Sequence, residues 1–149
     1  MRTTACIATA LAVLAAAPVG AADTPRFVSK VKLPSGQTAV VAEGEFEARS
    51  IGSFSVRLYD AATSEDETTF FASGVVSPRD GTVEQVTLAD LDNDRNPEII
   101  VKVRSAGSGG YLSAAAYRVT GKQIALASTV EGLAPDSDPV AALKKSVVR

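Results

Sequence analysis

Apolar and polar residues alternate along most of this 149-residue chain, and turn chemistry interrupts the alternation roughly every 8 to 12 residues. In residues 54–60, for example, Phe54, Val56 and Leu58 share one face, and the residues between them share the other. Because side chains of a strand point alternately to its two faces, this period of two is typical of half-buried strands. It favours an all-β fold over a helical one.

The same pattern predicts strands at residues 26–33, 38–47, 54–60, 69–76, 82–88, 98–104, 111–119 and 123–130. The turn residues at 34–36 predict a hairpin between the first two, and the Pro-Arg-Asp-Gly run at 78–81 predicts another between the fourth and fifth. Near the C-terminus, Asp138 can cap a helix that begins at Pro139 and continues through residues 140–145. We therefore expect an antiparallel β-sandwich with a short C-terminal helix.

Residues 1–22 have the anatomy of a secretory signal peptide. Arg2 is followed by an apolar run too short to cross a bilayer, and small residues then precede Asp23. We expect this leader to be removed and residues 23–149 to form one secreted domain. The single cysteine, Cys6, lies in the leader, so the mature domain must fold without a disulfide.

Composition excludes several kinds of chemistry. The chain has no histidine, so histidine general bases, catalytic triads with histidine and imidazole zinc sites are impossible. A net charge of -2 gives no general reason to bind nucleic acid or an anionic membrane. No motif for a cofactor is present, and we expect none.

Acidic residues cluster just before the predicted strand 98–104. Asp90, Asp92 and Asp94 have the two-residue spacing of hard-cation ligands, and Glu98 offers a further carboxylate. The segment is not an EF-hand, because Arg95 stands where the sharp turn requires glycine. Two interpretations stay open. One is a calcium-dependent binding or adhesion module, and the other is a solvated loop whose side chains bond their own backbone.

A glycine-rich loop follows the same strand. It carries Gly107, Gly109 and Gly110 and ends at Tyr111. Glycine is commonly used where the backbone is left-handed or where another group approaches it closely. The spacing of these glycines fits neither a phosphate-binding loop nor a nucleophile elbow. From the residues alone, an ordinary flexible hairpin is favoured over a binding loop.

The run from about residue 32 to residue 143 resembles the periplasmic inhibitors of invertebrate-type (i-type) lysozyme. The resemblance is carried by KLPSG at 32–36, AVVAEGEFE at 39–47, SVRLY at 55–59, RDGT at 79–82, EIIV at 98–101 and, above all, RSAGSGGYLSA at 104–114. The related inhibitors of vertebrate-type lysozyme have one more residue before the tyrosine and usually contain cysteines. This chain departs from both features, which favours the invertebrate-type group.

The resemblance implies a β-sandwich protein of the periplasm that is not an enzyme and whose Ser-Gly-x-Tyr loop enters the lysozyme cleft. Ser108, Gly109 and Tyr111 match that motif, and Gly110 fills its variable position. Arg104 either pairs with carboxylates in the cleft or only caps the end of its strand. A carbohydrate hydrolase with two catalytic carboxylates is a third interpretation. An exposed sheet edge would also permit a homodimer.

Overall fold

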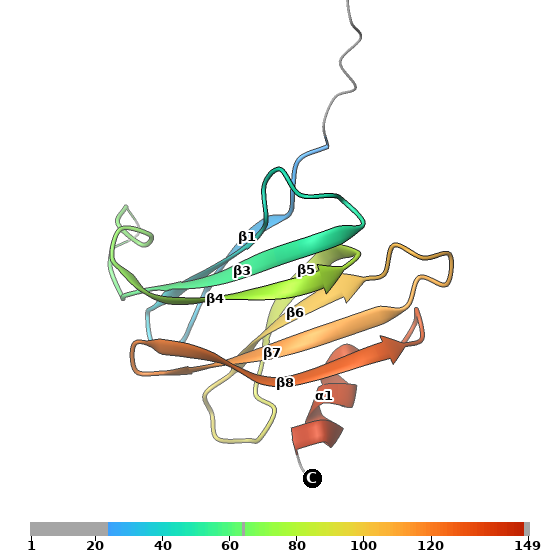
Figure 1. Cartoon of the computed structure of the whole chain (residues 1–149). Coiled ribbons are helices and arrows are strands. Elements are labelled where there is room, and N and C mark those ends of the chain that lie inside the picture. Colours follow the sequence, from blue (N-terminus) through green and yellow to red (C-terminus); the bar gives the residue numbers. More distant parts are fainter. Residues whose placement is uncertain (1–23, 64, 148–149) are drawn as a thin grey trace, which may run out of the picture.

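The computed structural model describes residues 24–63 and 65–147, and the predicted signal peptide lies outside this part of the chain. The described residues form two four-stranded antiparallel sheets and one helix (Figure 1). The first sheet has the order β1 (Val28–Lys32), β2 (Thr38–Glu43), β3 (Ile51–Tyr59) and β4 (Phe71–Asp80). The second has the order β5 (Thr82–Ala89), β6 (Glu98–Arg104), β7 (Leu112–Thr120) and β8 (Gln123–Leu133). The predicted antiparallel β-sandwich is confirmed.

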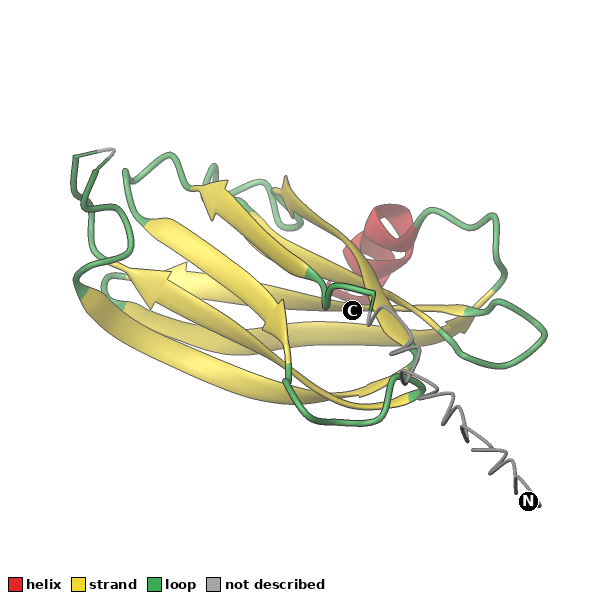
Figure 2. Cartoon of the chain, turned by 90° about the horizontal axis from the view of Figure 1, so that it is seen from above, coloured by secondary structure: helices red, strands yellow, loops and turns green. Residues whose placement is uncertain are grey.

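The two sheets pack face to face and bury the apolar face of each strand between them (Figures 1 and 2). Val56 and Leu58 from β3 and Val101 from β6 are completely buried in this core. Phe54 and Tyr117 join the sheets edge to face, with ring centroids 6.2 Å apart. The period of two in the sequence is therefore the alternation between this core and the outer faces.

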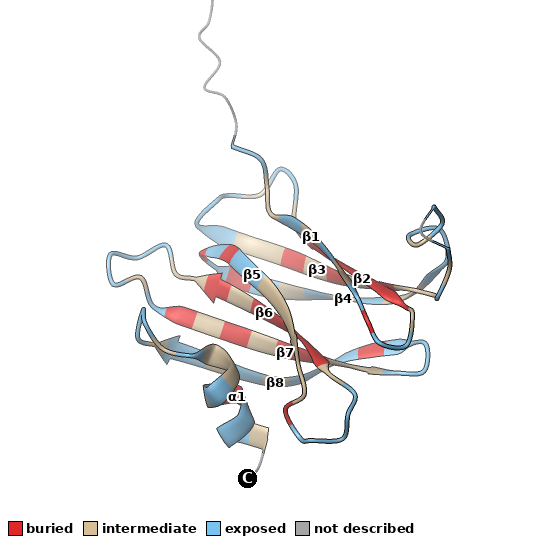
Figure 3. Ribbon diagram, turned by 180° about the vertical axis from the view of Figure 1, so that it is seen from behind, coloured by how far each residue is buried: buried red, intermediate tan, exposed pale blue. Residues whose placement is uncertain are grey.

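A second, smaller core lies on the outer face of the second sheet. Helix α1 (Pro139–Val147) packs there and buries Leu143 against Ile100 and Ala116 (Figure 3). Its predicted start is confirmed, because the Val140 amide donates to the Asp138 carboxylate at 2.9 Å. β6 is consequently buried on both faces. Within the described residues, no helix is long and apolar enough to cross a membrane.

The first predicted hairpin is confirmed, and the second is wrong. β1 pairs with β2 across a turn in which Gly36 has a φ of 86°. β4 instead runs on through Pro78 and Arg79 to Asp80 and pairs with β3, while β5 pairs with β6 in the other sheet. Residues 78–81 thus lead the chain from one sheet to the other. Pro78 can lie in β4 because an edge strand has one side on which no amide donor is needed.

Several strand boundaries also differ from the prediction, and the region between β2 and β3 is the clearest case. β2 ends at Glu43, so residues 44–50 form a loop, and β3 already begins at Ile51. The Glu47 carboxylate lies inside this loop and accepts hydrogen bonds from the amide and the hydroxyl of Ser53, both at 2.6 Å. These bonds hold the pKa of Glu47 below its usual value. The loop therefore folds around its own acidic side chain instead of continuing the strand.

Candidate functional site

The glycine-rich loop connects β6 to β7 and projects from one end of the sandwich (Figure 1). Its base is closed by the Ser105 amide, which donates to the Tyr111 carbonyl at 2.9 Å. A turn at its tip is closed by the Gly110 amide, which donates to the Gly107 carbonyl at 3.2 Å. Gly110 has a φ of 57°, so a residue without a side chain suits this position. The loop is a defined hairpin connection.

The tip of the loop presents its polar groups and its aromatic ring to solvent. Ser108 and Gly109 are exposed, and Tyr111 is 55% exposed. Within the described residues, the Ser108 hydroxyl has no hydrogen-bond partner. The Tyr111 ring lies against Gly109, since a Cβ there would be 2.4 Å from Tyr111 Cε2. The loop thus combines a free hydroxyl with an exposed aromatic ring that packs on bare backbone.

Arg104, at the end of β6, braces this loop from one side. Its Nη1 donates to the Gly110 carbonyl at 2.9 Å. Its Nε and Nη2 donate to the Glu84 carboxylate at 3.1, 2.9 and 3.0 Å. Lys102 Nζ lies 3.4 Å from the same carboxylate. The hydrogen bonds from Arg104, and then the charge of Lys102, lower the pKa of Glu84. Glu84 is a residue of the site that the sequence interpretation missed.

The corner between the two sheets supports the loop from below. Gly81 has a φ of 114°, and a Cβ on it would lie 1.9 Å from the Arg104 carbonyl oxygen, so only glycine fits. The neighbouring Arg79 side chain is fully buried and donates to the carbonyls of Ala48, Arg49, Ser53 and Gly81. The backbone under the loop is therefore tightly tied to the first sheet.

A groove of about 570 Å³ opens beside the loop. It is lined by apolar side chains from both sheets, among them Ile51, Leu112 and Leu126, and Tyr111 stands in its wall. Deeper in the groove, the Tyr117 hydroxyl donates to Ser77 Oγ at 2.6 Å, and burial raises the pKa of Tyr117. The loop thus borders this groove, and the Tyr111 ring forms part of the groove wall.

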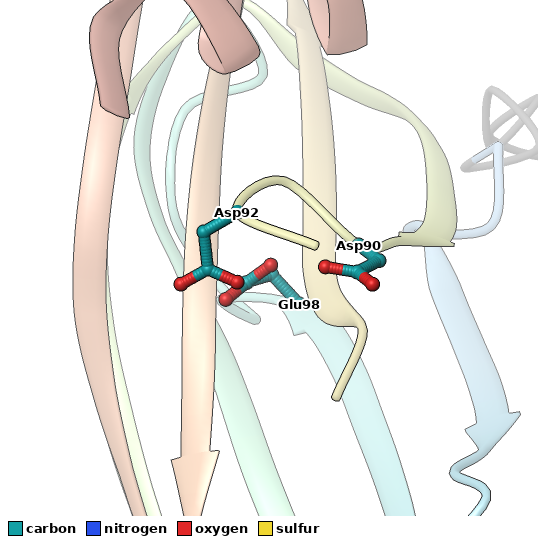
Figure 4. Close-up of side chains that lie close together, drawn as sticks. All are labelled: Asp90, Asp92 and Glu98. Carbon is teal, nitrogen blue, oxygen red and sulfur yellow. The ribbon is translucent and has the colours of Figure 1, made fainter. Parts of the chain in front are cut away.

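The acidic loop between β5 and β6 lies at the other end of β6. Asp90, Asp92 and Glu98 each offer a carboxylate oxygen, and these atoms lie within 4.8 Å of one another (Figure 4). Asp94 is not in this group. Its carboxylate accepts the Asn96 amide at 2.7 Å, which lowers the pKa of Asp94.

Positive charge already lies among these carboxylates. Arg118 Nη2 lies 2.5 Å from Asp92 and 2.7 Å from Glu98, which is completely buried. The contact with Glu98 raises the pKa of Arg118. The Asp90 carboxylate accepts the amides of Asp94 and Arg95. This geometry favours the interpretation in which the loop bonds its own backbone over the one in which it holds calcium.

Comparison with known proteins identifies the family. Residues 25–147 match the family model described as periplasmic lysozyme inhibitor of I-type lysozyme. The crystal structure of such an inhibitor from Aeromonas hydrophila is 45% identical, with a TM-score of 0.74 over 78% of this chain and 98% of that one. The Aeromonas hydrophila inhibitor in complex with Meretrix lusoria lysozyme is 46% identical, with a TM-score of 0.73 over 79% and 95%.

No curated protein matches the chain. The family match covers most of the sequence, and both crystal structures share its fold and nearly half of the aligned residues. The chain therefore belongs to the family of periplasmic lysozyme inhibitors of I-type lysozyme, which are protein inhibitors and not enzymes.

Proposed function

We propose that this protein inhibits I-type lysozymes in the periplasm, after removal of residues 1–22, by inserting the loop of Ser108, Gly109, Gly110 and Tyr111 into the lysozyme cleft. The observation that carries the proposal is the projecting loop, with its free Ser108 hydroxyl and its exposed Tyr111 ring. A relative of this chain has been crystallised with Meretrix lusoria lysozyme, which supports the choice of partner.

The chemistry of the loop suits the target. Glycoside hydrolases of the lysozyme kind use two carboxyl groups that flank the scissile bond, and an occupied cleft excludes the sugar. The Ser108 hydroxyl and the exposed glycine amides can donate to such carboxylates, and a charge-assisted hydrogen bond contributes about 1.5–3 kcal/mol. Tyr111 adds an aromatic surface with a polar tip, a combination that is common at the centre of interfaces.

The deciding experiment measures the activity of I-type, chicken-type and goose-type lysozymes against increasing concentrations of the mature protein. We expect stoichiometric inhibition of the I-type enzyme and little effect on the other two. Full I-type activity at excess inhibitor would rule out the proposal. Incubation of the protein alone with peptidoglycan checks that it has no hydrolase activity of its own.

The Ser108→Ala variant tests whether the loop carries the inhibition. Loss of one donor to a carboxylate should weaken inhibition at least tenfold, because about 1.4 kcal/mol corresponds to a factor of ten. Thr120→Ala, which removes an exposed hydroxyl at the far end of β7, is the matched control and should inhibit like the wild type. Equal inhibition by both variants would place the binding surface elsewhere.

A further inference from the structure

We propose that Glu84 is a positioning residue for the inhibitory loop: it holds the Arg104 guanidinium so that Arg104 fixes the Gly110 carbonyl. The inference rests on the proposed function, because it assigns how the same loop is held in its binding geometry. Glu84 is expected to act through Arg104 and the loop, without contacting the lysozyme.

An irregularity in strand pairing places Glu84 at this position. β5 and β6 pair in regular antiparallel register, except that the register shifts between Val83 and Gln85. Val83 faces Val103 and Gln85 faces Lys102, so Glu84 is the extra residue of a β-bulge. Its carboxylate reaches both cationic side chains of β6, Arg104 at 2.9 Å and Lys102 at 3.4 Å. A bulge next to a functional loop commonly redirects one side chain in this way.

The hydrogen bonds of Arg104 assign a different partner to each side of its guanidinium group. The edge formed by Nε and Nη2 is taken by the two oxygens of Glu84, in the paired geometry that orients a guanidinium most firmly. Nη1 then points to the Gly110 carbonyl, at 2.9 Å. With its charge balanced by Glu84, Arg104 is poorly suited to pair with carboxylates in the lysozyme cleft. This favours a supporting role for Arg104 over direct contact.

The position of the Gly110 carbonyl affects the conformation of the whole loop tip. It joins the turn at the tip to Tyr111, and its left-handed backbone is one of several conformations open to glycine. A loop with three glycines loses much conformational freedom when it binds, and a bond that orders the loop beforehand reduces this loss. The Glu84–Arg104–Gly110 chain therefore sets the direction in which the Tyr111 ring is presented.

The Glu84→Gln variant tests the proposal, because the two roles of Arg104 predict opposite changes. If Glu84 positions the loop, the inhibition constant for an I-type lysozyme should rise about tenfold, which corresponds to about 1.4 kcal/mol. If Arg104 contacts cleft carboxylates, removing its partner should leave inhibition unchanged or strengthen it, and this result would overturn the proposal. The melting temperature should stay unchanged, since exposed ion pairs add little to stability.

The matched control is Glu65→Gln, which makes the same charge change in an exposed glutamate of the loop between β3 and β4. It should inhibit like the wild type. A loss of inhibition equal to that of Glu84→Gln would show that overall charge, and not the brace, is responsible. That outcome would also overturn the proposal.

A double-mutant cycle shows whether Glu84 acts through the loop. In the Tyr111→Ala background, Glu84→Gln should weaken inhibition by less than twofold, because the ring that it helps to direct is gone. Fully additive losses would mean that Glu84 acts independently of Tyr111, contrary to the proposal.

Amide hydrogen exchange gives a readout that needs no lysozyme. The Ser105 amide closes the base of the loop, and it should exchange faster in Glu84→Gln than in the wild type or in Glu65→Gln. Unchanged exchange would overturn the positioning role. If the wild type fails to inhibit any I-type lysozyme, the proposed function fails, while this exchange experiment still tests the brace by itself.

Discussion

The two loops at the ends of β6 use polar groups in opposite ways. The acidic loop before β6 has many charges, yet its carboxylates are occupied by backbone amides and by Arg118. The glycine-rich loop after β6 has few polar side chains, yet it leaves the Ser108 hydroxyl and the Tyr111 ring exposed. Charge density and free hydrogen-bonding capacity are therefore found in different loops of this molecule. Free bonding capacity distinguishes the loop proposed to bind from the one that stabilises the fold.

The largest effect should come from breaking the ion pair of the acidic loop. Arg118→Ala leaves the buried Glu98 carboxylate with only the Leu91 amide, and it should lower the free energy of unfolding by about 3 kcal/mol. Urea denaturation measures this loss. Arg95→Ala, in the same loop, should cost little, and inhibition by folded Arg118→Ala should be normal. A loss below about 0.5 kcal/mol would mean that the loop is not structural in the sense described here.

In the glycine-rich loop we expect the reverse result, in which inhibition is weakened and stability is kept. Tyr111→Ala should weaken inhibition about 30-fold, equivalent to about 2 kcal/mol, because an exposed aromatic ring is a typical anchor at an interface. Its melting temperature should match that of the wild type, since Tyr111 is largely exposed and belongs to neither hydrophobic core. Phe70→Ala, which removes an exposed aromatic ring at the opposite end of the sandwich, serves as the control. Equal loss of stability and inhibition would assign Tyr111 to folding instead.

A smaller change sharpens the comparison without removing any group from the loop. In Gly109→Ala, the added Cβ would lie 2.4 Å from Tyr111 Cε2, so the ring must move aside. We expect inhibition to weaken roughly fivefold, about 1 kcal/mol. In Gly107→Ala the nearest atom is the Ser105 hydroxyl at 3.6 Å, and this variant should inhibit normally. Titration of lysozyme with the two proteins side by side decides the point.

The smallest expected effect is that of added calcium on the melting temperature. The Arg118 guanidinium already contacts both Asp92 and Glu98. Calcium at 1 mM, about 100 times the dissociation constant of a 10 µM site, should therefore give the same melting temperature as a chelator. A real site of that affinity would add about 2.7 kcal/mol of stability. A calcium-dependent rise in melting temperature would therefore restore the interpretation of the acidic loop as a cation site.

Local patterns predicted the elements of this fold well, because each depends on residues close in sequence. Alternation located all eight strands of the described residues, and Asp138 and Pro139 marked the start of the helix. The hairpin at residues 78–81 failed because turn chemistry bends the chain but does not specify the next pairing partner. The burial of Arg79 also required knowledge of the carbonyls of Ala48, Arg49 and Ser53, which a segment distant in sequence supplies.

The proposed binding loop could be identified from the sequence for the same reason, and its supporting residues could not. Ser108, Gly109, Gly110 and Tyr111 are contiguous, so a motif could identify them. Glu84 is 20 residues before Arg104 and reaches it only through a bulge, which no periodicity reveals. Arg118 likewise meets Glu98 through the register of β6 and β7, in which Ile99 lies opposite Tyr117. Cross-strand partners of this kind become visible only once the register is known.

Each sheet is a meander of four consecutive strands, and a single corner at Gly81 separates the two. Pairings between neighbouring strands close short loops, so each half of the chain can form its own sheet without waiting for the other. The hydrogen bond from the Val83 amide of β5 to the Glu43 carboxylate of β2, at 2.7 Å, requires both sheets together. During folding, the end of the molecule that carries the Tyr111 loop would thus be completed last, when the two halves dock.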